Sequence, residues 1–108
     1  MTVTQLADEL SLTRLTVMTD AEVASCYISD LLSRVLGGVK SGDVWITVQS
    51  SINVIAVAVM TEASCVIFPE GVTAQENVLL KANEENLTVF SSQESAFALA
   101  KKLVALGL

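Results

Sequence analysis

The sequence contains no histidine. Histidine is the commonest general base, the commonest protein ligand for metals and the usual pH switch near neutrality. Its absence excludes a Ser-His-Asp triad and a zinc site within this one chain. The serines therefore have no base to activate them. We expect no catalytic residue, no metal site and no cofactor.

Basic residues are also scarce, with six Lys and Arg against twelve Asp and Glu and a formal net charge of −6. They are scattered along the chain, at Arg14, Arg34, Lys40, Lys81, Lys101 and Lys102. A phosphate backbone repels such a surface, and an anionic membrane attracts a protein only through a basic patch. Aromatic residues for base stacking make up only 5% of the chain. We expect neither nucleic acid nor a membrane as a partner.

Cysteine and long apolar runs are limited too. Cys26 and Cys65 each sit inside an apolar, strand-like run, which predicts buried free thiols. They could form a redox pair only if their strands are neighbours. The most apolar stretch, Ile52 to Met60, is too short to span a bilayer and contains Asn53. The N-terminal residues lack the pattern of a signal peptide, so we expect a cytoplasmic protein.

Apolar residues are plentiful, at 52% of 108 residues, which is enough for one domain with one core. Helix and strand patterns alternate along the chain. The sequence predicts helices from Thr2, at 31–36, at 52–62, at 73–83 and after Ser91, and strands at 14–18, 23–28, 44–48, 64–68 and 87–90. This rhythm predicts one three-layer α/β/α domain over residues 1–108, with a mostly parallel sheet of about five strands joined by right-handed crossovers.

Local signals set the expected helix ends and faces. Capping boxes are predicted at Thr2 with Gln5, Thr73 with Glu76, and Ser91 with Glu94; Ser29 and Asp30 offer a cap for helix 31–36, which Gly37-Gly38 ends. The last helix is expected to bury one face made of Phe97, Ala100, Leu103 and Val104. Helix 52–62 is apolar almost all round, so we expect it to be packed on both sides or to lie at a subunit interface.

Four short polar segments follow the predicted strands: Ser29-Asp30, Gln49-Ser50-Ser51, Pro69-Glu70-Gly71 and Ser91-Ser92. In parallel α/β sheets, ligands bind outside the carboxyl ends of the strands, and free N–H groups at helix starts favour anions. The candidate ligand-binding residues are Ser29, Asp30, Gln49, Ser50, Asn53 and Gly71. Helix capping and strand termination explain the same residue types without a ligand, so both interpretations stay open.

Motifs for phosphate chemistry are not met. Gly37-Gly38-Val39-Lys40-Ser41 resembles the end of a phosphate-binding loop, but Val39 stands where the motif needs glycine. The loop also runs from a helix into a strand, which is the reverse of the required order. Adjacent carboxylates such as Glu84 and Glu85 fall in regions expected to be solvated surface.

Two further runs of sequence form a recognisable pattern: Cys26-Tyr27-Ile28-Ser29-Asp30-Leu31-Leu32-Ser33 and Gly42-Asp43-Val44-Trp45-Ile46-Thr47-Val48-Gln49, continued by Asn53-Val54-Ile55-Ala56-Val57-Ala58. Together they resemble the DRTGG domain family. The later strands and helices occupy the family's expected places, so the resemblance covers nearly the whole chain. Members often carry a Thr-Gly-Gly-like turn after the fourth strand. Here the turn is Phe68-Pro69-Glu70-Gly71, which keeps only the final glycine.

The resemblance implies an accessory role. The family is similar to the N-terminal domain of HPr kinase/phosphorylase and to accessory domains of phosphotransacetylases and CBS-type pyrophosphatases. Kinase activity in such proteins belongs to a separate domain with a phosphate-binding loop, which this chain lacks. We therefore expect a non-catalytic regulatory or protein-interaction domain, acting as a homodimer or with a partner enzyme. The alternative is a sensor that binds a nucleotide or another small anion at the strand ends. An enzyme would need a cofactor or a partner chain to supply its base.

Overall fold

Five strands form one sheet, in the order β1-β5-β4-β3-β2. The computed structural model describes all 108 residues. Its elements are α1 Val3–Glu9, β1 Thr13–Arg14, β2 Cys26–Ile28, α2 Leu32–Gly38, β3 Val44–Ile46, α3 Ile52–Met60, β4 Cys65–Phe68, α4 Glu76–Glu84, β5 Val89–Ser91 and α5 Ala96–Ala105. Strands β2 to β5 pair in parallel, and β1 pairs antiparallel with β5. The predicted mostly parallel α/β sheet is confirmed.

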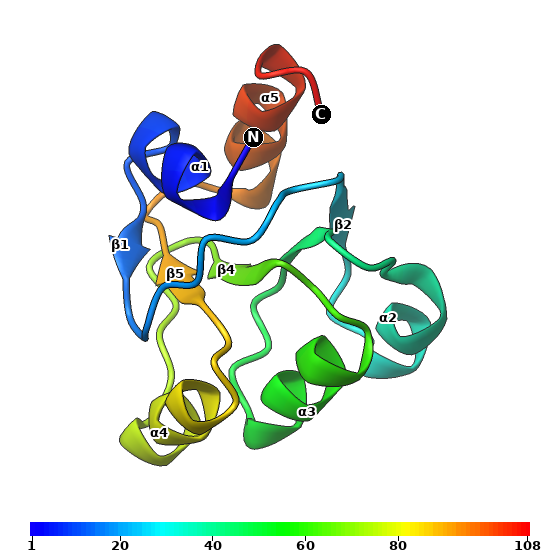
Figure 1. Cartoon of the computed structure of the whole chain (residues 1–108), viewed down its shortest axis with the longest axis vertical. Helices are drawn as coiled ribbons and strands as arrows, with labels where there is room; N and C mark the ends of the chain where they lie inside the picture. Colours follow the sequence, from blue (N-terminus) through cyan, green and yellow to red (C-terminus); the bar gives the residue numbers. More distant parts are fainter.

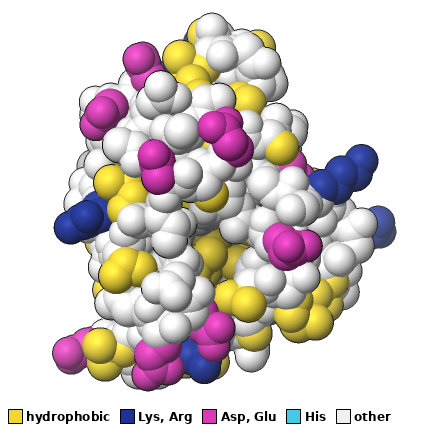
Figure 2. All heavy atoms as spheres, viewed as in Figure 1, with side chains coloured by type: hydrophobic (Ala, Val, Ile, Leu, Met, Phe, Trp, Pro, Cys, Tyr) yellow, Lys and Arg dark blue, Asp and Glu magenta, His cyan; other side chains and the backbone are white.

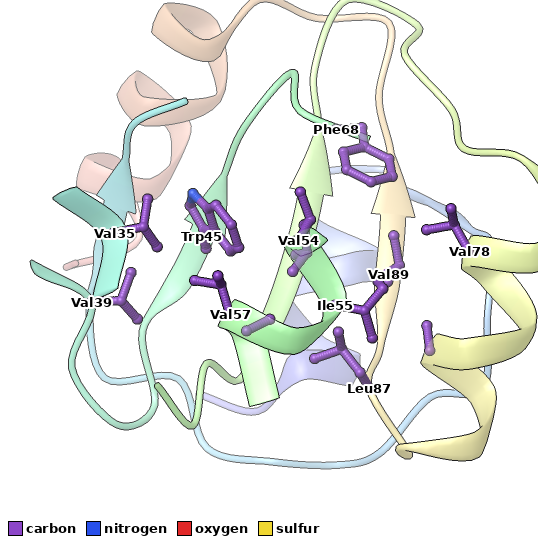
Figure 3. Close-up of a cluster of buried hydrophobic side chains, with 13 residues drawn as sticks. Val35, Val39, Trp45, Val54, Ile55, Val57, Phe68, Val78, Leu87 and Val89 are labelled. Atoms are coloured by element: carbon purple, nitrogen blue, oxygen red, sulfur yellow. The ribbon is translucent and has the colours of Figure 1, made fainter. Parts of the chain in front are cut away.

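Helices cover both faces of this sheet, with α1 and α5 on one side and α2, α3 and α4 on the other (Figure 1). Successive side chains of a strand point to opposite faces. Trp45 therefore packs toward α2 and α3, whereas its neighbours Val44 and Ile46 pack toward α1 and α5. The core is thus divided into two clusters by the sheet, and Figure 3 shows the one beneath α2, α3 and α4.

The helices that connect parallel strands all lie on one face. Strands β2, β3, β4 and β5 are neighbours in chain order, so each crossover of the same hand steps in the same direction and deposits its helix on the same side. The other face is covered by the terminal helices. Ligand crevices in open sheets form where the strand order reverses, and the parallel part of this sheet has no such reversal.

Strand β1 is shorter than the predicted 14–18, because beyond Leu15 a side chain and not the backbone bonds to β5. The Leu15 N–H still donates to the Val89 carbonyl, at 2.9 Å. At the next position the Thr16 hydroxyl takes over: it accepts from the Val89 N–H at 2.8 Å and donates to the Leu87 carbonyl at 2.9 Å. The edge of β5 is therefore satisfied without a longer strand.

One of the predicted capping boxes is confirmed. The Gln5 N–H donates to the Thr2 hydroxyl at 3.2 Å, and the Thr2 N–H donates to the Gln5 amide oxygen at 2.9 Å. At the start of α2 the prediction is wrong, because Leu31 occupies the N-cap position and neither Ser29 nor Asp30 caps the helix. The glycines Gly37 and Gly38, expected to end α2, are its last residues.

The other two predicted boxes are wrong. Helix α4 begins after Gln75, not at Thr73. Ser91 is the last residue of β5, and α5 begins after Ser95, whose hydroxyl accepts from the Ala98 N–H at 3.1 Å. Both helices start later because the chain first completes the turns that follow β4 and β5.

The predicted buried face of α5 is also wrong in part. Leu103 is buried as expected, together with Leu99, but Phe97 and Val104 are 74% and 69% exposed. The residues that pack in the core on this side of the sheet are Ala96, Leu99 and Leu103. They form a face of α5 next to the predicted one. Both stripes have helical spacing in sequence, and only packing against the sheet distinguishes them.

Helix α3 lies between α2 and α4 and packs against both (Figure 1). Its inner half is buried on the sheet, while Ile52, Val59 and Met60 remain exposed on its outer half. The expectation that this helix is packed on both sides is confirmed, because α2 and α4 flank it. No helix in the chain has the length and apolar character needed to cross a membrane.

Candidate ligand site at the strand ends

The polar segments that follow the parallel strands lie along one edge of the sheet, because parallel strands end on the same side. They do not form a single cluster. The turn after β2 bonds to the end of β3, the turn after β4 bonds to the segment after β5, and a hollow lies between the starts of α3 and α4. Each group has its own set of partners.

The turn after β2 is held to the end of β3 by hydrogen bonds. Asp30 Oδ1 accepts from the Thr47 hydroxyl and from the Val48 N–H, both at 2.9 Å. The Ser29 carbonyl accepts from the Trp45 indole N–H at 2.9 Å, and the Ser29 hydroxyl accepts from the Leu31 N–H at 3.3 Å. These two candidate residues therefore already serve to join neighbouring strands.

The turn after β4 is fixed in a similar way. Gly71 has φ of +73°, and its N–H donates to the Ser92 carbonyl at 2.8 Å. The preceding Glu70 N–H donates to the Glu94 carbonyl at 2.8 Å. A Cβ at position 71 would lie 2.9 Å from the Gln93 side-chain oxygen. The positive φ favours glycine here, whereas the end of the Gln93 side chain could move aside for a Cβ, and the Gly71 N–H is occupied.

The hollow between α3 and α4 has a volume of about 470 Å³. Its walls come from the loop after β3 and from the first residues of the two helices: Val48, Gln49, Ser50, Ser51, Ile52, Gln75, Asn77 and Val78. Of the candidate residues, Gln49 and Ser50 line it. Asn53 is exposed nearby on α3, and Ser29, Asp30 and Gly71 lie outside the hollow.

Backbone N–H groups give the hollow its chemical character. Helix α3 starts after Ser51 and α4 after Gln75, and neither N-cap side chain bonds to its helix. The first-turn N–H groups of a helix lack intrahelical partners, and they carry the positive end of its dipole. No Lys or Arg lines the hollow, and Glu76 stands in the first turn of α4. The site therefore suits an uncharged polar group, such as a carbonyl or a heterocycle, better than a bare anion.

Gln75 and Asn77 are the polar lining residues that the sequence did not predict. They follow the long turn after β4, and that turn folds α4 back so that its start meets the start of α3. The sequence placed Gln75 inside the helix predicted at 73–83 and gave it no functional signal. Its approach to Gln49 depends on tertiary packing, which local sequence patterns do not report.

The two cysteines cannot form a disulfide in this fold. Cys26 and Cys65 both pair with Val44, so β3 lies between their strands. Two steps of sheet spacing separate them by roughly 10 Å, beyond the Cα separation of about 7 Å that a disulfide allows. Both thiols are free, as predicted. Cys65 is buried as expected, but the predicted burial of Cys26 is wrong in part, because Cys26 is partly exposed. Burial raises the pKa of Cys65 to about 12 and that of Cys26 to about 11.

This burial predicts a loss of stability in alkali. The unfolded chain releases the Cys65 proton near its usual pKa of 9.0, whereas the folded chain holds it up to a pKa of about 12. The stabilisation is complete below the lower value and disappears as the pH rises between the two. At about pH 10.5 we expect Cys65 to cost about 2 kcal/mol of unfolding free energy relative to neutral pH.

Urea unfolding of the wild type and of Cys65→Ala across this pH range measures the effect. Lysine and tyrosine titration is common to both proteins, so the difference between their pH slopes isolates the thiol. Parallel slopes would contradict the prediction.

Comparison with known proteins adds the fold relationship. No protein-family model matches the chain, and no curated protein sequence does. Among solved structures, the chain is similar to the CBS and DRTGG domains of the regulatory region of a Clostridium perfringens pyrophosphatase, complexed with its activator diadenosine tetraphosphate. The TM-score is 0.73 over 94% of this chain, at 16% sequence identity.

At that identity the likeness establishes a shared fold. The resemblance to DRTGG domains that the sequence indicated is therefore confirmed as a structural one. This chain spans 45% of the length of the solved pyrophosphatase chain. The pyrophosphatase activity and the activator are therefore properties of that protein.

Proposed function

We propose that this chain is a non-catalytic regulatory domain that works through protein association, as a homodimer. Its fold is shared with a regulatory region of an enzyme. The polar residues that gather at the strand ends, Asp30 and Ser29 among them, are engaged in hydrogen bonds within the chain. With no histidine in the sequence, these groups have no partner that makes them an acid–base pair.

The observation that carries the proposal is apolar side chains left in solvent. On α3, Met60 is 71% exposed, Ile52 43% and Val59 39%, on the one helix that is flanked on both sides. Contiguous apolar patches are small on monomeric proteins, and larger ones mark surfaces that bind another protein. An apolar outer face on a central helix therefore favours association.

Sedimentation velocity at micromolar concentration tests this proposal. We expect a species of twice the chain mass of 11.4 kDa. A chain that stays monomeric in this range would overturn the homodimer.

The second candidate function is a small-ligand sensor, favoured by the hollow between α3 and α4. The solved pyrophosphatase region has a nucleotide activator, and the hollow offers amide and hydroxyl groups beside free backbone donors. An adenine base presents acceptors and donors that such groups match. The full phosphate charge would have to extend beyond the hollow, because no cation lines it.

A thermal-shift screen with nucleotides and other metabolites tests the sensor. A ligand at about 100 times its Kd adds roughly 2.7 kcal/mol of stability. We expect Gln75→Ala to abolish the shift and Asn53→Ala to preserve it, since Asn53 lies outside the hollow. A screen with no shift, or an equal loss in both variants, would reject this site.

A further inference from the structure

Helix α3 has a second apolar face, directed away from the sheet. Its buried positions are Val54, Ile55, Val57 and Ala58. The exposed residues on the opposite side are Ile52, Asn53, Ala56, Val59 and Met60, at helical spacing. We call the four apolar ones the outer stripe, and Asn53 is the one polar residue among them. A surface helix normally carries polar residues on that side. The outer stripe instead matches the composition of a helix covered by another protein.

The neighbouring helices extend this surface. Leu36 of α2 is 47% exposed and Leu80 of α4 is 54% exposed, and both helices pack beside α3. Figure 2 shows hydrophobic side chains gathered over α2 and α3, at the lower right of the view. The outer layer of the molecule thus presents an apolar strip with α3 at its centre.

Charges of opposite sign border the strip. Arg34 and Lys40, on α2 and just after it, are exposed and form no ion pair within the chain. On the far side α4 carries Glu76, Glu84 and Glu85, with Lys81 bonded to the last two at 3.8 and 3.0 Å. In Figure 2 acidic side chains cluster over α4 at the lower left, and basic side chains project at the right. The charge along the borders of the strip therefore changes from basic at α2 to acidic at α4.

We propose that a second copy of this chain covers the strip. The two copies are related by a two-fold axis that lies between them and is parallel to α3. This inference rests on the proposed homodimer and specifies its interface. Helices α2, α3 and α4 run in the same direction, because each connects parallel strands. Rotation about an axis parallel to α3 keeps that direction and exchanges the two borders. Helix α2 of each copy then faces α4 of the other.

The order of charges along the helices fits this arrangement. Arg34 lies in the first turn of α2, and Glu76 is the first residue of α4, so these two meet at one end. Lys40 follows the end of α2, and Glu84 closes α4, so these meet at the other end. A two-fold axis across the helices would instead oppose α2 with α2 and α4 with α4, and like charges at an interface are unfavourable.

Another apolar surface supplies the rival interface. A groove of about 220 Å³ lies between β2 and α5 and is lined by Ser25, Cys26, Ile28, Ala100, Leu103, Val104 and Leu108. Lys101, also on α5, stands over the Phe97 ring, with its Nζ 5.6 Å from the ring centroid. No Asp or Glu lines the groove to pair with this lysine. The groove therefore lacks the paired charges that orient a second copy.

Two matched lysine substitutions separate these surfaces. Met60 and Val104 lie in the last turns of α3 and α5 and are 71% and 69% exposed, so each tolerates a charge in the folded monomer. We expect Met60→Lys to raise the dimer Kd by about 100-fold or more, because it places a charge in the core of the interface. Val104→Lys should leave the Kd within about threefold. Far-UV circular dichroism verifies that both variants fold.

Charge reversal tests the orientation. We expect Arg34→Glu and Glu76→Lys each to weaken the dimer by about 10-fold, and the double variant to recover the wild-type Kd. Additive losses in the double variant would overturn the parallel axis. A dimer that survives Met60→Lys but dissociates with Val104→Lys would overturn this interface while keeping the homodimer. A monomeric wild type would overturn both.

Discussion

Replacing Trp45 by alanine is expected to lower the free energy of unfolding by about 3 to 5 kcal/mol, the range for a fully buried aromatic side chain. Trp45 is 0% exposed at the centre of β3, with paired strands on both sides. Figure 3 shows it among side chains of α2, such as Val35, and of α3, such as Val57. Its indole N–H also donates to the Ser29 carbonyl at 2.9 Å. The substitution thus opens a cavity and frees a polar group.

A Trp45→Phe variant removes the same donor but leaves a much smaller cavity than alanine does. It keeps an aromatic ring but removes the donor, so we expect a loss of about 1 to 2 kcal/mol. Urea unfolding followed by far-UV circular dichroism measures both variants, because Trp45 is the single tryptophan and its fluorescence reports only on the wild type. A loss below about 1 kcal/mol for Trp45→Ala would mean that this cluster is not the centre of the core.

Thr16→Val is expected to cost about 2 to 4 kcal/mol, although it preserves the shape of the side chain. The Thr16 hydroxyl is the partner of both the Val89 N–H and the Leu87 carbonyl, and the residue is only 6% exposed. A methyl group in its place leaves a buried donor and a buried acceptor without hydrogen bonds. Each such group costs about 1 to 3 kcal/mol, and partial access of water lowers the sum.

The matched control is Thr16→Ser, which retains the hydroxyl and removes one methyl group. We expect it to lose about 1 kcal/mol. The comparison is made in the same urea titration, with amide hydrogen exchange at Val89 as a local probe. Equal losses for the valine and serine variants would assign the role of Thr16 to its methyl group instead of its hydroxyl.

The alternation of elements was predictable because the apolar strands are short and nearly continuous. The run Cys65–Phe68 is buried throughout, which identifies it as a strand covered on both faces. Element ends were harder to predict. Serine or threonine followed three residues later by glutamate also arises by chance, as at Ser91 and Glu94, where the serine completes β5. The true cap of α5, Ser95, is determined by how far the preceding turn must extend.

The strand-end edge was predictable from topology, but its internal grouping was not. Asp30 is a residue type common at helix caps, but its partners Thr47 and Val48 follow the next strand, β3. Gln75 had no local signal for a site at all. Local patterns describe contacts within a turn or a helix, and these contacts join segments separated by one or more elements.

The two chain ends lie on the same side of the sheet. Met1 and Leu108 both pack against the cluster beneath α1 and α5, and Figure 1 places both termini on that side. A fluorophore, affinity handle or surface linker attached at either end therefore emerges opposite α2, α3 and α4. Immobilising the protein through a terminus would leave that layer open to solution, so a sensor chip would present it unobstructed.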